Sequence, residues 1–406
     1  MKVRKILLLI IVVLSICTGC NERNYGESQS NGKADILNER QQIICADSEQ
    51  LAGGYRDIYE KAQKDDKRNS LELKLKIAEY FRNKGYAAVD MGNQIDMVNY
   101  EKVEEFCGKA ENAEKAEIII FSIMDEGGFV RYDMESGEGE IEVIVSSLKW
   151  ENHNPHTDYY HEFKAYTWKY TENGYFFIEE YHPPGFDGAP GQKGFRVKPL
   201  NQICRELNRK YVIPIGYERN NMLIVDWNEQ DYTNLEFYDL YELMYRLKYD
   251  TYAPYNADYM GAEYEIPKSE FEEVIQTYFR IDSEEIQKNA VYYSDSQTYR
   301  YRPRGLYDYE MPYEPYPEVV DYEEQSDGTL KLFIQAVWER KEQDCAFASE
   351  LVVRPLENGQ YQYVSNQVIH SSENSEAQWY MPRLPDDEWL HYYKELALQN
   401  KKLYEE

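Results

Sequence analysis

The stretch Glu140-Ile-Glu-Val-Ile-Val-Ser146 decides the fold class, because its apolar side chains at 141, 143 and 145 recur with the period of two that is typical of a β-strand. Farther along, Asn173-Gly174 separates two aromatic runs, which predicts a tight hairpin turn. Around these two features we place a β block from Glu117 to Tyr181.

A second β block is predicted from Pro317 to Ile369, and it resembles the first. Three groups of residues correspond in order and spacing: Phe129-Val-Arg-Tyr132 with Val319-Val-Asp-Tyr322, then Ile141, Val143 and Val145 with Leu330, Leu332 and Ile334, then Glu172-Asn-Gly174 with Glu357-Asn-Gly359. These matches favour an internal duplication of the chain.

Helical patterns precede each β block. The first runs from about Glu39 to Ala110. In the second, Ser269 and Glu272 form a capping box before an apolar helical face made by Phe271, Val274, Ile275 and Tyr278. Helices followed by a curled antiparallel sheet are the α+β arrangement of cystatin-like or NTF2-like domains. The βαβ alternation of a Rossmann or periplasmic-binding fold does not occur, which weakens a solute-binding interpretation.

The N-terminus has the pattern of a bacterial lipoprotein signal. Basic residues among the first five precede an apolar run from Ile6 to Ile16, which is shorter than the about 20 residues of a spanning helix. The run ends in Cys17-Thr-Gly-Cys20, which resembles a lipobox with cysteine where leucine is usual. We expect cleavage before Cys20, acylation of its thiol and anchoring on the outer face of the cell membrane; a plain signal that releases a soluble protein is the alternative.

The net charge of the chain limits the kinds of partner that it can bind. The chain carries 74 acidic and 45 basic side chains, a formal net charge of −29. A surface this acidic repels nucleic acid, so no nucleic-acid partner is expected. After Cys20 there follow Cys45, Cys107, Cys204 and Cys345, which contain no Cys-x-x-Cys pair, and the sequence leaves their disulfide state open.

These patterns divide the chain into six expected segments: a signal peptide at 1–19, a flexible stalk at 20–38, a first α+β domain at 39–182, a Pro/Gly-rich joint at 183–194, a second α+β domain at 195–385, and a C-terminal amphipathic helix at 386–406. Trp389, Tyr393, Leu396 and Leu403 lie on one side of the last helix. We expect this side to dock on the second domain.

Several stretches between 120 and 370 are similar to an uncharacterised family of Gram-positive bacterial membrane lipoproteins, a domain of unknown function. They are Tyr170-Thr-Glu-Asn-Gly-Tyr175, Arg196-Val-Lys-Pro-Leu200, Cys204-Arg-Glu-Leu-Asn-Arg209, Pro214-Ile-Gly-Tyr217, Tyr301-Arg-Pro-Arg-Gly-Leu-Tyr307, Pro317-Glu-Val-Val320 and Tyr363-Val-Ser-Asn366. The resemblance implies a membrane-anchored extracytoplasmic protein, and it supplies no activity, ligand or catalytic residue.

Two clusters are candidate sites. Neutral imidazoles at His153, His156 and His161 have a spacing that suits zinc, although a polar loop explains them equally well. In the segment 299–316, Arg300, Arg302 and Arg304 alternate with tyrosines that include Tyr299 and Tyr301. An arginine row with aromatic flanks suits a carboxylate, a phosphate or a sugar ring, unless the arginines pair with neighbouring acids.

The sequence contains no P-loop, Gly-x-Gly-x-x-Gly, Gly-x-Ser-x-Gly, His-Glu-x-x-His or EF-hand loop, and it indicates neither catalytic residues nor a cofactor. Tyrosine is abundant, with 40 residues, and Trp150, Trp168 or Trp338 are further candidates for stacking on glycans. We therefore expect a non-catalytic binding or accessory module at the cell surface, with an envelope protein or a glycan as partner. The alternatives are an enzyme acting on cell-wall or extracellular polysaccharide and a ligand-capturing subunit of a transporter.

Overall fold

The computed structural model describes residues 31–257, 261–308, 313–371 and 377–393, with side chains from residue 39 onward. The chain divides into two compact units, Met1–Ser48 and Glu49–Glu406. Helix α2 (Asn31–Gly53) is the described part of the first unit and continues into the second. None of the helices within these described ranges is long and apolar enough to cross a membrane.

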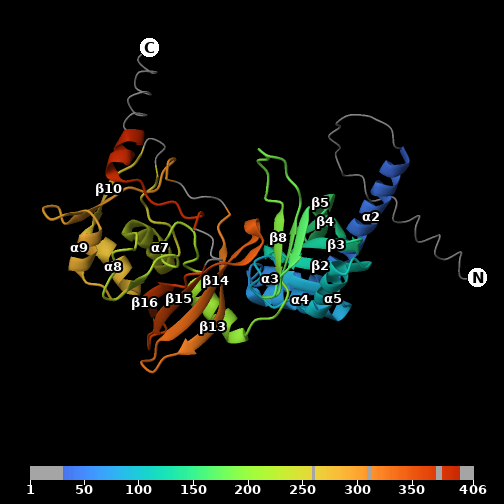
Figure 1. Ribbon diagram of the computed structural model, residues 1–406, viewed down its shortest axis with the longest axis horizontal. Helices are drawn as coiled ribbons and strands as arrows, with labels where there is room; N and C mark the ends of the chain where they lie inside the picture. The colour runs from blue at the N-terminus through green and yellow to red at the C-terminus, as the bar shows by residue number, and fades with distance from the viewer. Residues whose placement is uncertain (1–30, 258–260, 309–312, 372–376, 394–406) are drawn as a thin grey trace, which may run out of the picture. The chain divides into compact units, whose positions relative to one another are not determined.

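The first half of the larger unit packs helices on a five-stranded sheet (Figure 1). The helices are α3 (Arg56–Lys64), α4 (Leu71–Lys84) and α5 (Tyr100–Glu111). The strands, in their order across the sheet, are β1 (Ala87–Asp90), β2 (Ala116–Ile123), β3 (Phe129–Gly137), β4 (Glu140–Glu151) and β5 (Asn154–Lys164). Strands β1 and β2 pair in parallel, with α5 between them in the chain, and all later neighbours pair antiparallel.

Helix α4 shows how the sequence sets this packing. Ser70 caps its start, because the Ser70 hydroxyl accepts a hydrogen bond from the Leu73 backbone N–H at 3.2 Å. Gly85 ends the helix in the left-handed region, with a φ of 84° that glycine adopts without strain. The buried side of α4 carries Phe81, whose ring stacks on Phe121 of β2 with 4.0 Å between centroids. This contact fixes the helix to β2 of the sheet.

A small antiparallel sheet follows, made of β6 (Thr167–Tyr170), β7 (Tyr175–Glu179) and β8 (Gln192–Arg196). Gly174 has a φ of 89° in the β6–β7 turn, as expected for the Asn-Gly pair there. Phe195 and Val197 belong to the first hydrophobic core, whereas Cys204 belongs to the second. The change between the two cores therefore falls after Val197 and not within the Pro/Gly-rich segment at 183–194, because β8 pairs with β7 and returns the chain to the first core.

The second core contains helices and two further sheets. The helical elements are α6 (Gln202–Leu207), η2 (Asn208–Val212), α7 (Phe237–Tyr249), α8 (Lys268–Tyr278) and α9 (Ser283–Asn289). One sheet has the order β10 (Tyr264–Pro267), β12 (Thr298–Tyr301), β11 (Tyr292–Tyr293). The other has the order β13 (Tyr316–Glu324), β14 (Leu330–Trp338), β15 (Gln343–Pro355), β16 (Tyr361–Val368), β9 (Trp227–Asn228).

The predicted fold class is confirmed at the coarse level. The described residues form a mixed helix and sheet structure with several antiparallel sheets, none of which is closed. Both predicted β blocks contain antiparallel meanders, β2–β5 and β13–β16. Each meander has a register shift in its last hairpin, at Ser147/Leu148 between β4 and β5 and at Val352/Val353 between β15 and β16.

One local prediction is wrong, and one is confirmed in part. Helix α8 begins at Lys268 without a side-chain cap, because Glu272 bonds to Lys268, Ser283 and Tyr299 instead of closing a capping box with Ser269. At the C-terminus, residues 386–393 form a helix whose Tyr393 is buried against Gly261 and Gly305 of the second half. Leu396 and Leu403 lie outside the described residues.

Candidate functional site

A cavity of about 500 Å³ opens where the first sheet, the β7–β8 hairpin and the β14–β15 hairpin meet. We call it the aromatic cleft. Six aromatic side chains line it: Tyr132, Tyr159, Phe163, Tyr313, Tyr316 and Trp338. Its charged or titratable lining side chains are His161, Glu180, Lys193, Glu314, Glu339 and Arg340. Its size lies within the range of ordinary ligand sites.

The aromatic side chains of the cleft divide into a buried floor and an exposed rim. Tyr132 and Trp338 are buried, whereas Tyr159 and Tyr313 remain 51% and 48% exposed. The Trp338 indole N–H donates to the Tyr313 carbonyl at 3.0 Å, and the Arg340 guanidinium lies 5.7 Å from the centre of the Tyr313 ring. Both contacts hold the exposed Tyr313 ring in place at the rim.

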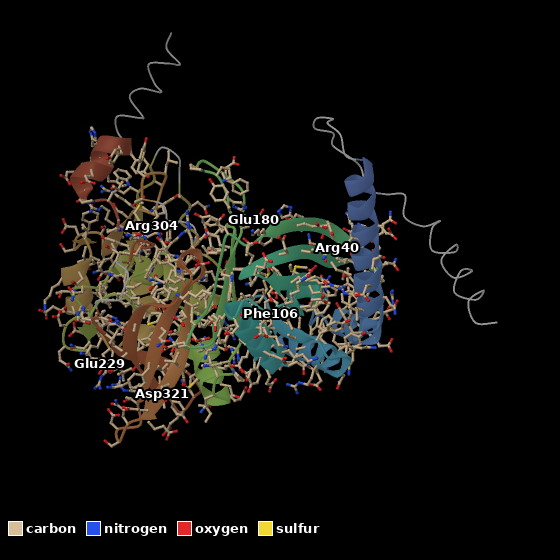
Figure 2. All side chains as sticks on the ribbon, turned by 45° about the vertical axis from the view of Figure 1, so that its right-hand side comes forward. Arg40, Phe106, Glu180, Glu229, Arg304 and Asp321 are labelled. Carbon is tan, nitrogen blue, oxygen red and sulfur yellow. The ribbon has the colours of Figure 1, made fainter. Side chains whose placement is uncertain are left out.

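Charged groups of the cleft pair with one another. A ring nitrogen of His161, Nε2, lies 2.7 Å from Glu180 Oε1; Glu180 is labelled in Figure 2. Glu339 Oε1 accepts from the Lys193 ammonium and from the Gly194 backbone N–H, both at 3.2 Å. The cleft therefore combines aromatic faces with locally neutralised polar groups.

The hydroxyls of Tyr132, Tyr159 and Tyr316 in the cleft stay protonated at neutral pH. Burial raises the pKa of Tyr132, and the carboxylate of Glu339 raises it further. Burial also raises the pKa of Tyr159, with a smaller contribution from Glu180, and places the pKa of Tyr316 well above its usual value. These hydroxyls can both donate and accept hydrogen bonds.

Behind the cleft, a buried polar network joins the two cores. The Asn93 amide donates to the Tyr316 hydroxyl at 3.1 Å, and Tyr316 donates to the Tyr175 hydroxyl at 3.1 Å. Tyr175 in turn donates to Glu318 at 2.8 Å, and the Arg196 guanidinium lies 3.2 Å from the same carboxylate. Burial raises the pKa of Glu318, although Arg196 opposes the shift. The network fixes the wall of the cleft that carries Tyr316.

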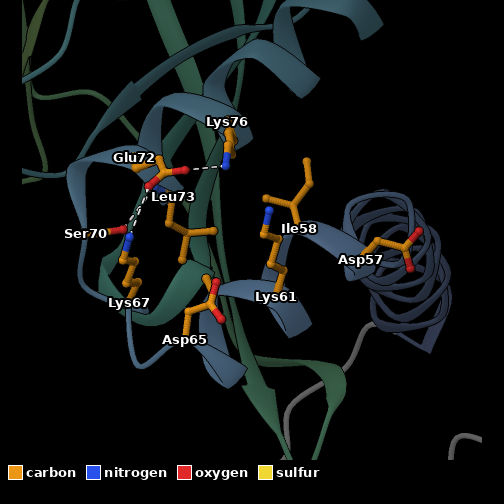
Figure 3. A pocket seen from close by; sticks show the side chains of 10 residues that line it. Asp57, Ile58, Lys61, Asp65, Lys67, Ser70, Glu72, Leu73 and Lys76 are labelled. Carbon is orange, nitrogen blue, oxygen red and sulfur yellow. Dashed lines mark hydrogen bonds and ion pairs between the residues drawn. The ribbon is translucent and has the colours of Figure 1, made fainter.

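A second hollow of about 400 Å³ lies between α3 and α4 (Figure 3). Glu72 lies there between Lys76, at 2.5 Å, and Lys67, at 3.7 Å. The Ser70 hydroxyl is used as the helix cap. These ion pairs are exposed, and the residues around them offer no aromatic surface, so this hollow is the weaker candidate.

The three histidines do not form a metal centre. His153 lies in the β4–β5 turn with a φ of 66°, and its carbonyl accepts from Arg56. His156 lies opposite Lys149 in the sheet, and His161 pairs with Glu180 in the cleft. Among the residues that the structure describes, no three His, Cys, Asp or Glu side chains converge as metal ligands. His153 lies in the turn, and His156 and His161 lie opposite Lys149 and Val145, four residues apart along β4, so the three imidazoles are spread along the sheet.

The arginine row is already occupied by the protein's own groups. Arg300 and Arg302 bind Asp386 at 2.6 and 2.9 Å, and Arg302 also binds Glu263 at 2.7 Å. Arg304, labelled in Figure 2, is buried and binds both oxygens of Asp239. The row therefore holds the C-terminal helix and α7 in place and is not an open anion clamp.

Tyr299 and Tyr301, the two tyrosines beside this row, are also bound by other residues of the protein. The Tyr299 hydroxyl donates to Glu272 at 2.6 Å, and the Tyr301 hydroxyl donates to Glu242 at 2.7 Å. Both rings are buried. They belong to the second core and present no face to a ligand.

The remaining candidates from the sequence are cysteines. Cys20 lies outside the described residues. Cys107 and Cys204 are buried, and burial raises the pKa of both thiols, which keeps them protonated and unreactive.

Sequence reasoning missed most of the aromatic cleft. Trp338 was a stacking candidate and His161 a metal candidate, but neither pattern linked them to Tyr159, Tyr313 or Arg340. The only local signal is alternation in β5, which does not say which strand or hairpin faces it.

Comparison with known proteins gives one match. The model of a family of unknown function, DUF6070, matches residues 41–383, which is most of the chain. The protein therefore belongs to this family. No curated protein and no solved structure matches it.

Proposed function

We propose that this member of the DUF6070 family is a lipid-anchored binding module on the outer face of the cell membrane, and that the aromatic cleft is its ligand site. The observation that carries the proposal is the cleft itself: two half-exposed tyrosine rings above a floor of buried aromatic side chains. Concave sites of this size with a few polar groups are the usual form of ligand pockets.

The proposed anchor rests on the N-terminal pattern. Small residues precede Cys20, and the short apolar run before them is typical of a cleaved signal. Metabolic labelling with palmitate tests it: we expect Cys20→Ala to abolish the label and Cys17→Ala to leave it. Label that persists in Cys20→Ala would contradict the anchor.

We further propose that the two halves derive from one duplicated α+β unit of the cystatin-like or NTF2-like kind. The meanders β2–β5 and β13–β16 support this origin, and so do the register shifts in the last hairpin of each. The parallel pairing of β1 with β2 belongs to the first half alone among the described strands.

Ligand binding is tested by thermal unfolding of residues 21–406 with glycans, muropeptides, calcium and zinc. A ligand at 100 times its Kd stabilises the folded state by about 2.7 kcal/mol. We expect a shift with an organic ligand that Tyr159→Ala reduces. A shift that this variant does not change would place the ligand outside the aromatic cleft.

A catalytic role on polysaccharide is the second candidate, because Glu180 and Glu339 are among the carboxylates that line the same cleft. Glycosidases use such a pair as acid and as base or nucleophile. Here Glu180 pairs with His161, and Glu339 with Lys193. Release of reducing ends from a glycan, lost in Glu180→Gln and in Glu339→Gln, would establish catalysis in place of simple binding.

A further inference from the structure

The chemistry of the aromatic cleft narrows the class of its ligand, an inference that rests on the proposed binding function. Three classes of ligand are compared for this site: an anionic polymer, a lipid chain and an uncharged glycan. They differ in what they require of charge, of enclosure and of flat apolar surface.

Charge argues against an anionic polymer. Lys193 is neutralised by Glu339, and His161 is paired with Glu180. Arg340 is the remaining cation of the lining, and it lies over the Tyr313 ring. The chain as a whole carries −29, so a polyanion would be repelled at long range and would meet little compensating positive charge in the cleft.

Exposure argues against a lipid chain. Tyr159 and Tyr313 are about half exposed, and the polar side chains of Glu180, Lys193 and Glu339 line the same space. A hydrocarbon chain in such a site would leave much of its surface in water and would desolvate these polar groups without compensation.

The cleft matches the requirements of a sugar ring. A pyranose has an apolar face of C–H groups and a periphery of hydroxyls, so it stacks on an aromatic face and hydrogen-bonds at its edge. Tyr159 and Tyr313 offer half-exposed rings in the lining, and Arg340 lies over one face of the Tyr313 ring. Glu339 uses Oε1 for Lys193 and Gly194, while its Oε2 has no hydrogen bond among the described residues and can accept one from a hydroxyl.

We infer that the aromatic cleft binds an uncharged glycan strand, with sugar rings stacked on Tyr159 and Tyr313 and a sugar hydroxyl donating to Glu339. The raised pKa values of Tyr132 and Tyr159 support this geometry, since their hydroxyls remain neutral partners for sugar hydroxyls.

Isothermal titration calorimetry on residues 21–406 tests the inference. The probes are cellohexaose and chitohexaose as uncharged glycans, a galacturonic acid hexamer as an anionic glycan, and a short apolar peptide. We expect an uncharged hexamer to bind, with Kd raised at least tenfold in Tyr159→Ala and in Tyr313→Ala. Tyr159→Phe keeps the ring and should keep most of the affinity.

Tyr252→Ala is the matched control, because Tyr252 is 73% exposed and does not line the cleft. Uncharged hexamers that bind all variants equally, or not at all, would overturn the glycan inference. Binding of only the anionic hexamer or the peptide, weakened by Tyr159→Ala, would also overturn it while the cleft kept its binding role. If cleft variants change the affinity for no probe and for no ligand of the thermal panel, the proposed function fails as well.

Discussion

The arginine row and the aromatic cleft both place arginine beside tyrosine. They differ in whether these side chains are bound by other residues of the protein or remain exposed. In the arginine row, Arg304 binds Asp239 and the rings of Tyr299 and Tyr301 are buried. In the aromatic cleft, Arg340 lies over Tyr313, whose ring is 48% exposed. The same residue types therefore make a structural joint in one place and an open surface in the other.

The difference arises from distant acids. Asp239 lies 65 residues before Arg304 in the chain, and Asp386 lies 86 residues after Arg300. These acids form ion pairs with the row, and the Arg302 guanidinium lies 4.1 Å from the centre of the Trp389 ring of the C-terminal helix. Arg340, by contrast, has no ion pair among the described residues. The presence of arginine and tyrosine side by side in the sequence therefore does not tell whether a region binds a ligand or holds the protein together.

The largest effect is expected at Asp239, the carboxylate that binds both Arg304 and Arg383. Asp239→Ala would leave two guanidinium groups buried without their shared partner, which we expect to lower the free energy of unfolding by about 3–5 kcal/mol. Urea unfolding measures it. The exposed Asp387→Ala is the control, with an expected change within about 0.5 kcal/mol. A loss under about 1 kcal/mol at Asp239 would show that the row is not a structural joint.

Much of this joint could not be predicted from sequence, and the reason is the range of its contacts. Local periodicity identified the two β blocks and the Asn173-Gly174 turn, because these depend on neighbouring residues. Asp239 of α7 and Asp386 of the C-terminal helix bind Arg304 and Arg300. No local sequence pattern predicts these pairs.

The candidate site was still less predictable. Its lining reaches from Met91 to Arg340 and depends on how two separate cores meet. Alternation along β5 places Tyr159 on one face of the strand, but it gives no information on the hairpin opposite. The sequence predicted zinc because it shows three histidines, which are common zinc ligands, close together in the chain. It does not show where their side chains lie in the sheet.

Glu318, like Asp239, is a buried carboxylate that pairs with an arginine. Glu318 is a buried acid with Arg196 at 3.2 Å, and burial raises its pKa in the folded state. A raised folded pKa means that its contribution to stability is full below the unfolded pKa, about 4.3, and is lost as pH rises through the folded value. Glu318→Gln removes this loss and keeps an acceptor for Tyr175.

We therefore expect Glu318→Gln to gain stability relative to the natural protein as pH rises from 4 to 8, an effect smaller than that of Asp239→Ala. Urea unfolding at several pH values measures the difference. The exposed Glu284→Gln should show no such trend. A variant that loses stability with rising pH would show that Arg196 outweighs the cost of burial at this site.

A smaller effect is expected at Tyr299, which donates to Glu272. Burial alone would raise the pKa of Glu272, but hydrogen bonds from Lys268, Tyr299 and Ser283 lower it. A lowered folded pKa contributes stability above the unfolded value and loses it as pH falls through the folded value. Tyr299→Phe removes one of these bonds and should cost about 1 kcal/mol at pH 7.

The deficit of Tyr299→Phe should shrink as the carboxyl becomes protonated in acid. Unfolding at pH 7 and pH 3 measures this change. Tyr293→Phe is the control, because Tyr293 is exposed on the neighbouring strand β11. An equal deficit at both pH values would mean that the hydroxyl stabilises the core by packing and not through the carboxylate.

The smallest effect on stability is expected at the exposed tyrosines of the aromatic cleft, and it distinguishes the cleft from the arginine row. Tyr159 and Tyr313 are about half exposed, so truncation to alanine removes much less buried area than at a core ring, and we expect the free energy of unfolding to change by no more than about 1 kcal/mol. Removing the buried Tyr301 ring in the same way should cost about 3–5 kcal/mol. Thermal unfolding of the three variants makes the comparison. Rings that can be removed without a stability cost are available to a ligand; a large loss in Tyr159→Ala would instead mean that the cleft, like the arginine row, is part of the protein's own framework.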